Sequence, residues 1–235
     1  MKNIYLMAKK VLFIFEFWNL FILVHLSTLL RKHKRIQKTP NSILFLENFP
    51  IENSGYQYRA KKWANLLNNK GINCEVLTIL ESKTEFDNAL KNEPFSKFML
   101  QAIKIRYQQC LYAKKFETVI VRRELLFQND YGNLFMEKFL LKIHPNVILD
   151  FDDDISAAKK QPKRITNIYG KLLLEDGNKF NNTLRLYKRF IVASDYLKQK
   201  VLAENPNILE ENILVIPTCV DYNQYQIKKY PQKIE

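Results

Sequence analysis

The sequence predicts an α/β fold with a doubly wound, mostly parallel sheet. Short apolar runs recur between residues 41 and 225, and stretches with helical spacing separate them. Strands that alternate with helices in this way form parallel sheets with helices on both faces. The chain has 235 residues, of which 47% are hydrophobic and 13% aromatic. That composition is sufficient for one sizeable core.

The first half of the sheet comes from the segment after Pro40. Residues 42–48 predict a strand, residues 58–70 a helix that Gly71 ends, and residues 73–80 a second strand. The second half repeats the pattern. Further helices are expected at 94–115, 133–143, 166–186 and 195–204, and further strands at 117–123, 146–154, 189–194 and 213–217.

This alternation predicts a Rossmann-like domain. In such folds ligands bind beyond the carboxyl ends of the strands. The segments expected at that edge are 47–57, 122–124, 150–154, Ser194 and 217–221.

Residues 1–40 are expected to form a separate apolar helix with basic flanks. The apolar run at 11–30 is about as long as one bilayer crossing. Glu16 and Asn19 give the helix a narrow polar stripe, so three arrangements stay open: spanning a membrane, lying in its interface, or packing on the domain. The heavier basic flank at 31–38 places the domain on the cytoplasmic face of the inner or plasma membrane. An anionic membrane surface is therefore an expected partner.

The charge balance also suggests an anionic partner. The net charge is +13, but outside residues 31–38 the basic side chains are dispersed. We found no nucleic-acid-binding motif, so a nucleic acid is not an expected partner. The chain has three cysteines, an odd number without metal-ligand spacing. They are expected to be free thiols in a reducing compartment.

Three motifs at the predicted strand ends are candidates for a site. Gly55 before a helix is either a turn glycine or an approach point for an anion. Asp150-Phe151-Asp152 has the DxD pattern that can hold a divalent metal, although these acids could also cap a helix or bind hydroxyls. Arg122, Arg123 and Glu124 follow a strand directly, either as a rim ion pair or as contacts to an anionic or sugar substrate. The sequence lacks GxGxxG and Walker patterns, which disfavours nicotinamide cofactors and P-loop ATPase activity.

Taken together, three stretches resemble the N-terminal domain of GT-B glycosyltransferases of the group-1/family-four type. They are PIENSGYQYRAKKWANLLNNKGINCEVLTI, TVIVRRELLFQND with FMEKFL and VILDFDDDI, and FIVASDYLKQKVL with ENILVIPTCVDYNQY. They occur in the family's order and cover residues 42–225. The sequence departs from the family pattern in the first loop, where Ser54-Gly55 replaces two glycines, and at Thr218-Cys219, which replace Asn-Gly.

The resemblance implies an acceptor-side domain at 41–225, with a linker at 226–235 toward a donor-binding domain. It implies transfer of a sugar from a nucleotide sugar to a glycan or lipid-linked acceptor in envelope or polysaccharide synthesis, with no cofactor and no essential metal. A separate chain carrying the donor domain is a further expected partner, since residues 1–235 are expected to be inactive alone. The implied cleft residues are Asn53, Ser54, Gly55, Arg59, Arg123, Glu124, Asp152 and Asp153.

Two alternatives to this function stay open. The chain could be a non-enzymatic, membrane-tethered Rossmann scaffold, which its charge and N-terminal helix would suit equally. It could also be a metal-dependent GT-A transferase that uses Asp150 and Asp152.

Overall fold

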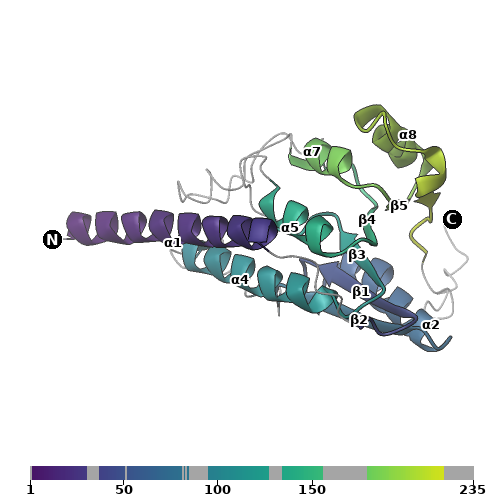
Figure 1. Ribbon diagram of the computed structural model, residues 1–235, viewed down its shortest axis with the longest axis horizontal. Coiled ribbons are helices and arrows are strands. Elements are labelled where there is room, and N and C mark those ends of the chain that lie inside the picture. Colours follow the sequence, from purple (N-terminus) through teal and green to yellow (C-terminus); the bar gives the residue numbers. More distant parts are fainter. Residues whose placement is uncertain are drawn as a thin grey trace, which may run out of the picture.

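The computed structural model contains a six-stranded sheet in the order β2-β1-β3-β4-β5-β6 (Figure 1). Each neighbouring pair of strands is parallel. The structure describes residues 2–30, 37–50, 52–80, 82, 84, 95–126, 134–155 and 179–219. The strands are β1 (Ser42–Glu47), β2 (Asn73–Thr78), β3 (Thr118–Arg122), β4 (Val147–Phe151), β5 (Phe190–Val192) and β6 (Ile213–Val215).

The predicted α/β fold with a Rossmann-like sheet is therefore confirmed. The described sheet is parallel throughout, and each strand is shorter than its apolar run. Asp152 to Asp154, for example, lie beyond the end of β4. The first half of the helix expected at 166–186 lies outside the described residues.

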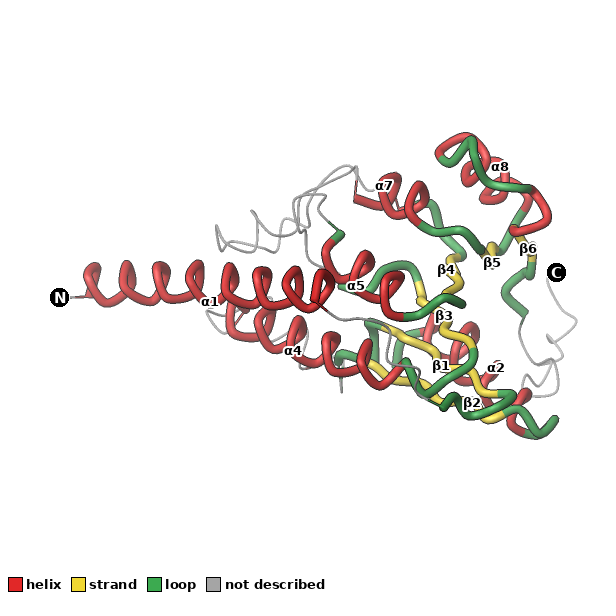
Figure 2. Tube along the Cα trace, viewed as in Figure 1, coloured by secondary structure: helices red, strands yellow, loops and turns green. Residues whose placement is uncertain are grey.

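Two layers of helices cover the sheet (Figure 2). Alternate strand residues point to opposite faces. Leu46 and Val121 join the larger core, to which α4, α5, α7 and α8 contribute, whereas Phe45 and Ile120 join a smaller core under η1 and α2. The elements are η1 (Tyr56–Lys61, a π-helix), α2 (Lys62–Asn68), α4 (Phe95–Ala113), α5 (Phe135–Ile143), α7 (Lys179–Leu186), α8 (Asp195–Glu204) and the short 3-10 helix η3 (Glu210–Asn212).

The N-terminal helix α1 (Lys2–Leu30) packs on the domain with its C-terminal half and projects from it with its N-terminal half (Figure 1). Phe17 and Val24 are buried against the larger core, and Phe21 makes an edge contact with Phe135 of α5 at 5.3 Å between ring centroids. Among the described residues, none of the helices combines the length and the hydropathy of a membrane span.

The three cysteines are unpaired, as predicted. Cys74 and Cys110 are buried and Cys219 is exposed. Burial raises the pKa of Cys110 to about 12, so this thiol stays protonated at neutral pH. Cys110 is therefore a core residue rather than a reactive thiol.

Candidate functional site

The sheet order places a topological switch point between β1 and β3. The chain leaves β1 toward β2 on one side, whereas β3 and the later strands lie on the other side. Crevices at such points, beyond the carboxyl ends of the strands, are where open α/β sheets bind ligands. A group of charged side chains lies there. We name Glu47, Arg59, Arg122 and Asp150 the switch-point cluster, and Arg123, Asp152 and Asp153 the rim.

Arg59 is the centre of the buried contacts in the switch-point cluster. Its Nε donates to Asp150 Oδ2 at 3.1 Å, and its Nη2 donates to Asp150 Oδ1. Its Nη1 donates to the carbonyl oxygen of Ile216 at 2.9 Å and to Thr218 Oγ1 at 3.1 Å. Arg59 belongs to the π-helical turn η1, an irregularity that is common at functional sites. It joins this turn to β4 and to the segment after β6.

Arg122 lies between Glu47 and the carboxylates of β4. Its Nη2 is 2.5 Å from Asp152 Oδ1, its Nη1 is 3.6 Å from Asp150 Oδ2, and its Nε is 3.9 Å from Glu47 Oε2. Burial alone would lower the pKa of Arg122, but the neighbouring carboxylates outweigh this effect and raise it. Arg122 is therefore a permanent cation beneath the rim.

Glu47 has the least satisfied carboxylate of the cluster. Its Oε1 accepts hydrogen bonds from the backbone N–H groups of Asn48 and Phe49, at 2.8 and 3.2 Å. Its Oε2 is buried and makes no hydrogen bond within the described structure. Burial raises the pKa of Glu47, and the nearby Arg122 opposes this shift only in part. A buried carboxyl of this kind binds a proton more readily than an exposed one.

The rim faces solvent. Arg123 donates through Nη2 to Asp152 Oδ1 at 3.1 Å and to Asp153 Oδ2. The side chain of Asp153 is 67% exposed. Burial favours the neutral form of Asp152, but Arg122 and Arg123 outweigh it and lower the pKa of this carboxyl. Arg123 has a φ of +64°, which few residues with a side chain adopt. This backbone conformation turns the chain out of β3. The lowered pKa keeps the Asp152 carboxylate ionised at neutral pH.

The loop after β1 approaches the cluster through Gly55. Asn53 Oδ1 accepts a hydrogen bond from the Gly55 N–H at 2.8 Å. A Cβ atom on Gly55 would lie 3.3 Å from Arg122 Nη2 and 2.9 Å from Asn53 Oδ1. The φ of Gly55 is −58°, so the position favours glycine because of this close approach rather than because of its backbone conformation. Ser54 is exposed beside it.

Arg106 of α4 holds the two loops of the switch point together. It is fully buried and donates to the carbonyl oxygens of Glu47 and Leu125, at 2.8 and 2.9 Å, and to Asn48 Oδ1 at 2.8 Å. Asn48 in turn donates from Nδ2 to the carbonyl oxygen of Glu124 at 2.8 Å. The loops after β1 and β3 are therefore fixed relative to each other.

The structure brings most of the predicted site residues to one edge of the sheet. Asn53, Gly55, Arg123, Asp152 and Asp153 lie around the Arg122 guanidinium, directly or through one or two neighbours. Arg59 lies on the same edge but is buried and binds Asp150. Glu124 points elsewhere, because its carboxylate pairs with Lys179 of α7 at 3.1 Å.

The sequence placed Glu47 in the segment expected at this edge but did not single it out as a site residue, and it did not predict Arg106 there. Glu47 had a usable signal, since it is a charged residue that ends an otherwise apolar strand. Arg106 had none, because its partners are backbone carbonyls up to 59 residues away. Arg122 was noticed next to Arg123, but only the structure shows that Arg122 is buried and Arg123 is at the rim.

The DxD acids are occupied by arginines. Asp150 pairs with Arg59 and Arg122, and Asp152 pairs with Arg122 and Arg123. Over the described ranges, no group of three or more His, Cys, Asp or Glu side chains is arranged to hold a metal ion. A metal at Asp150 and Asp152 would have to displace guanidinium groups that already neutralise both carboxylates.

Comparison with known proteins gave no assignment. No protein-family model matches the chain, and no curated protein is significantly similar to it in sequence. The function is therefore inferred from the geometry of the switch point and from the sequence motifs that lie there.

Proposed function

We propose that this chain is the acceptor-binding domain of a glycosyltransferase, which receives a sugar from a nucleotide sugar onto a glycan or lipid-linked acceptor. The observation that carries the proposal is the rim: the carboxylates of Asp152 and Asp153, oriented by Arg123, at the switch point of a parallel sheet. Carboxylates in fixed positions accept hydrogen bonds from sugar hydroxyl groups. The sequence resemblance points to the same edge.

The buried cluster supports this role because it makes the rim rigid. Arg122 holds Asp152 from below, and Arg59 and Arg106 fix the strand ends and loops on either side. Binding sites gain affinity when their polar groups are held in place before the ligand arrives. Because its carboxylates are held in place, the rim can bind one arrangement of hydroxyl groups on an acceptor in preference to others.

The same contacts favour an acceptor over a nucleoside diphosphate at this edge. Transfer from a nucleotide sugar requires cationic or N–H groups that stabilise the leaving diphosphate. Arg59, Arg122 and Arg123 are each already paired with carboxylates. The diphosphate is therefore proposed to bind to a second α/β domain, on this polypeptide or on a separate one.

Ligand-observed NMR on the purified chain tests the proposal. The probes are a panel of methyl glycosides and short oligosaccharides, together with UDP, GDP and their sugar conjugates. We expect saturation transfer to one group of glycans and a loss of at least about fivefold in affinity in Asp153→Ala, since a charge-assisted hydrogen bond contributes about 1–3 kcal/mol. The matched control is Glu210→Ala, which removes an equally exposed carboxylate paired with Lys198, beside β6.

Either of two results would overturn the acceptor assignment: glycan binding that Asp153→Ala leaves unchanged, or binding of nucleotide sugars without any glycan. Sugar transfer by residues 1–235 without a second polypeptide would disprove the proposal that the acceptor and the diphosphate bind to two different domains. Manganese binding in calorimetry that Asp152→Ala abolishes would instead support the metal-dependent alternative.

A further inference from the structure

The helix α1 has two apolar faces, of which the domain covers one. Phe17 and Val24 are buried on the face that packs against α4 and α5. Elsewhere on the helix, large apolar side chains remain 46–79% exposed. At 100° per residue, six of them fall within an arc of about 80° and form one continuous line along the helix. We name this line the outer stripe; its members are Val11, Phe15, Trp18, Ile22, Leu26 and Leu29.

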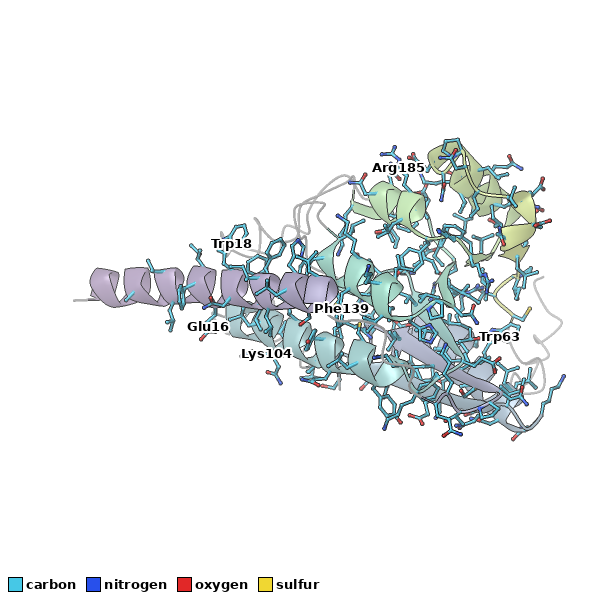
Figure 3. All side chains as sticks on the ribbon, viewed as in Figure 1. Glu16, Trp18, Trp63, Lys104, Phe139 and Arg185 are labelled. Atoms are coloured by element: carbon cyan, nitrogen blue, oxygen red, sulfur yellow. The ribbon has the colours of Figure 1, made fainter. Side chains whose placement is uncertain are left out.

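The polar residues of α1 do not interrupt the outer stripe. Figure 3 shows Trp18 and Glu16 on opposite sides of the helix. Asn19 lies at the border of the stripe, and Ser27 turns toward the domain, where its hydroxyl is 2.9 Å from the hydroxyl of Tyr107 in α4. The side of α1 away from the domain is therefore apolar over most of its length.

The outer stripe extends beyond the carboxyl edge of the sheet. Arg106 marks that edge, because it binds the carbonyl oxygens of Glu47 and Leu125. The next residue of α4, Tyr107, has its hydroxyl 2.9 Å from the hydroxyl of Ser27 in α1. Thr39, which follows α1 in the sequence, lies at the opposite, amino edge of the sheet, where its N–H donates to the carbonyl oxygen of Lys115. Residues before Ser27 thus lead away from the sheet (Figure 1), and Val11 lies about 24 Å along the axis from Ser27.

We propose that the outer stripe docks on an anionic lipid bilayer, with α1 lying along the surface of one leaflet. An interfacial helix needs an apolar face for the lipid and a polar partner on the other side. Here the domain occupies that other side along the C-terminal half of α1. Because the domain covers α1 from Phe17 onward on its other side, a flat arrangement is the one that brings the whole outer stripe against lipid.

Charge and composition favour a lipid surface over a second copy of the chain. Basic residues flank the outer stripe in the sequence, at Lys9 and Lys10 and again between Arg31 and Lys38, and the net charge is +13. Such a distribution is attracted to anionic headgroups, whereas two copies would bring like charges together. Trp18 lies near the middle of the stripe, and tryptophan prefers the membrane interface. This inference does not depend on the proposed glycan binding.

The test is co-sedimentation of the full chain with vesicles. We expect the chain to bind vesicles of phosphatidylcholine and phosphatidylglycerol (3:1). Its affinity for vesicles of pure phosphatidylcholine should be at least tenfold lower. The affinity of Phe15→Ser/Trp18→Ser for the mixed vesicles should also be at least tenfold lower than that of the parent chain. The control is Leu66→Ser, which removes an apolar side chain from α2 that is as exposed as Trp18 (51% and 50%). It should bind as the parent chain does. Far-UV circular dichroism shows that each variant is folded.

The depth of Trp18 in the bilayer is measured in a Trp63→Phe background. Its fluorescence is quenched by lipids that are brominated either near the headgroup or near the end of the acyl chain. Quenching mainly by the headgroup-proximal bromines supports the flat arrangement, and quenching mainly by the deep bromines disproves it. The docking proposal fails if vesicles do not bind the chain, or if the double variant binds as well as the parent. Dimerisation without lipid that Phe15→Ser/Trp18→Ser abolishes would show that a second copy covers the stripe instead.

Discussion

Arg59 and Asp150 form a buried, bidentate ion pair between the helix that follows β1 and the carboxyl end of β4. The same guanidinium also binds the carbonyl oxygen of Ile216 and Thr218 Oγ1. One side chain therefore connects three segments that are far apart in the sequence. This connection determines where the chain leaves the sheet after β6.

Removing the Arg59 guanidinium should destabilise the fold. Arg59→Met keeps most of the side-chain volume but leaves Asp150 buried with only the more distant Arg122 as a cationic neighbour. We expect a loss of about 3 kcal/mol in the free energy of unfolding, since breaking a buried pair costs about 3–5 kcal/mol. Urea unfolding measures it. In the double variant with Asp150→Asn the losses should be clearly less than additive.

The matched control for this pair is Arg185→Met. Arg185 makes an ion pair of similar length with Glu204, but its side chain is 59% exposed. Exposed pairs contribute about 0–1 kcal/mol. Equal losses of unfolding free energy in the two variants would mean that the buried Arg59–Asp150 pair stabilises the fold no more than an exposed pair does.

Gly55 and Gly71 should respond to alanine for different reasons. Gly71 has a φ of +82° and open space around it, so Gly71→Ala should cost about 1 kcal/mol through backbone strain. Gly55 has helical dihedral angles, so strain is absent. Its new Cβ would press against Asn53 Oδ1 and Arg122 Nη2. Displacing Asn53 breaks its hydrogen bond to the Gly55 N–H, and we expect a loss of about 1 kcal/mol.

The combination Asn53→Ala/Gly55→Ala separates these causes in thermal or urea unfolding. Asn53→Ala removes the nearest atom, so adding Gly55→Ala to that background should cost less than Gly55→Ala alone. The Asn53→Ala background should leave the cost of Gly71→Ala unchanged. Additive losses at positions 53 and 55 would contradict the contact argument.

The sequence predicted the strands and the edge of the site better than the roles of single residues. Apolar runs identify β1 and β3 because burial needs hydrophobic side chains at those positions. They do not reveal that Phe45 lies beside Ile120, since the order of strands depends on crossovers between distant segments. For that reason the contact between Glu47 and Arg122 could not be predicted. The buried orientation of Arg59 depends on the π-helical turn, which has no sequence pattern of its own.

Arg106 should be among the residues most important for stability. Burial lowers the pKa of its guanidinium to about 10, so it remains charged at neutral pH. Arg106→Met would leave the carbonyl oxygens of Glu47 and Leu125 and the Asn48 amide oxygen without their donor. We expect a loss of about 3–5 kcal/mol in urea unfolding. Arg106→Lys should restore little, because an ammonium group lacks the planar set of donors.

Lys104 provides the matched control for Arg106. It lies two residues earlier on α4 and its side chain is exposed, as Figure 3 shows. Lys104→Met removes one positive charge from the same helix without breaking buried hydrogen bonds. Its effect should stay within about 0.5 kcal/mol. A comparable loss in both variants would point to net charge rather than to the buried network.

His144 should make stability depend on pH at the opposite edge of the sheet. Its Nε2–H donates to the carbonyl oxygen of Phe116 at 2.9 Å, and its Nδ1 accepts from the Asn146 N–H at 3.2 Å. Burial, together with the nearby Lys38, lowers the pKa of the folded ring. The unfolded state then binds more protons as the pH falls below about 6.5, so this contribution to stability is complete above that pH and is lost toward the folded pKa.

Urea unfolding of the parent chain and of His144→Gln between pH 7.5 and 5 measures this term. The parent should lose more stability than the variant over that range, because glutamine does not titrate. Glu47 acts in the opposite direction, since its raised pKa makes the folded state gain protons as the pH falls. That contribution is common to both proteins and cancels in the difference. Parallel curves for the two proteins would show that His144 titrates alike in the folded and unfolded states.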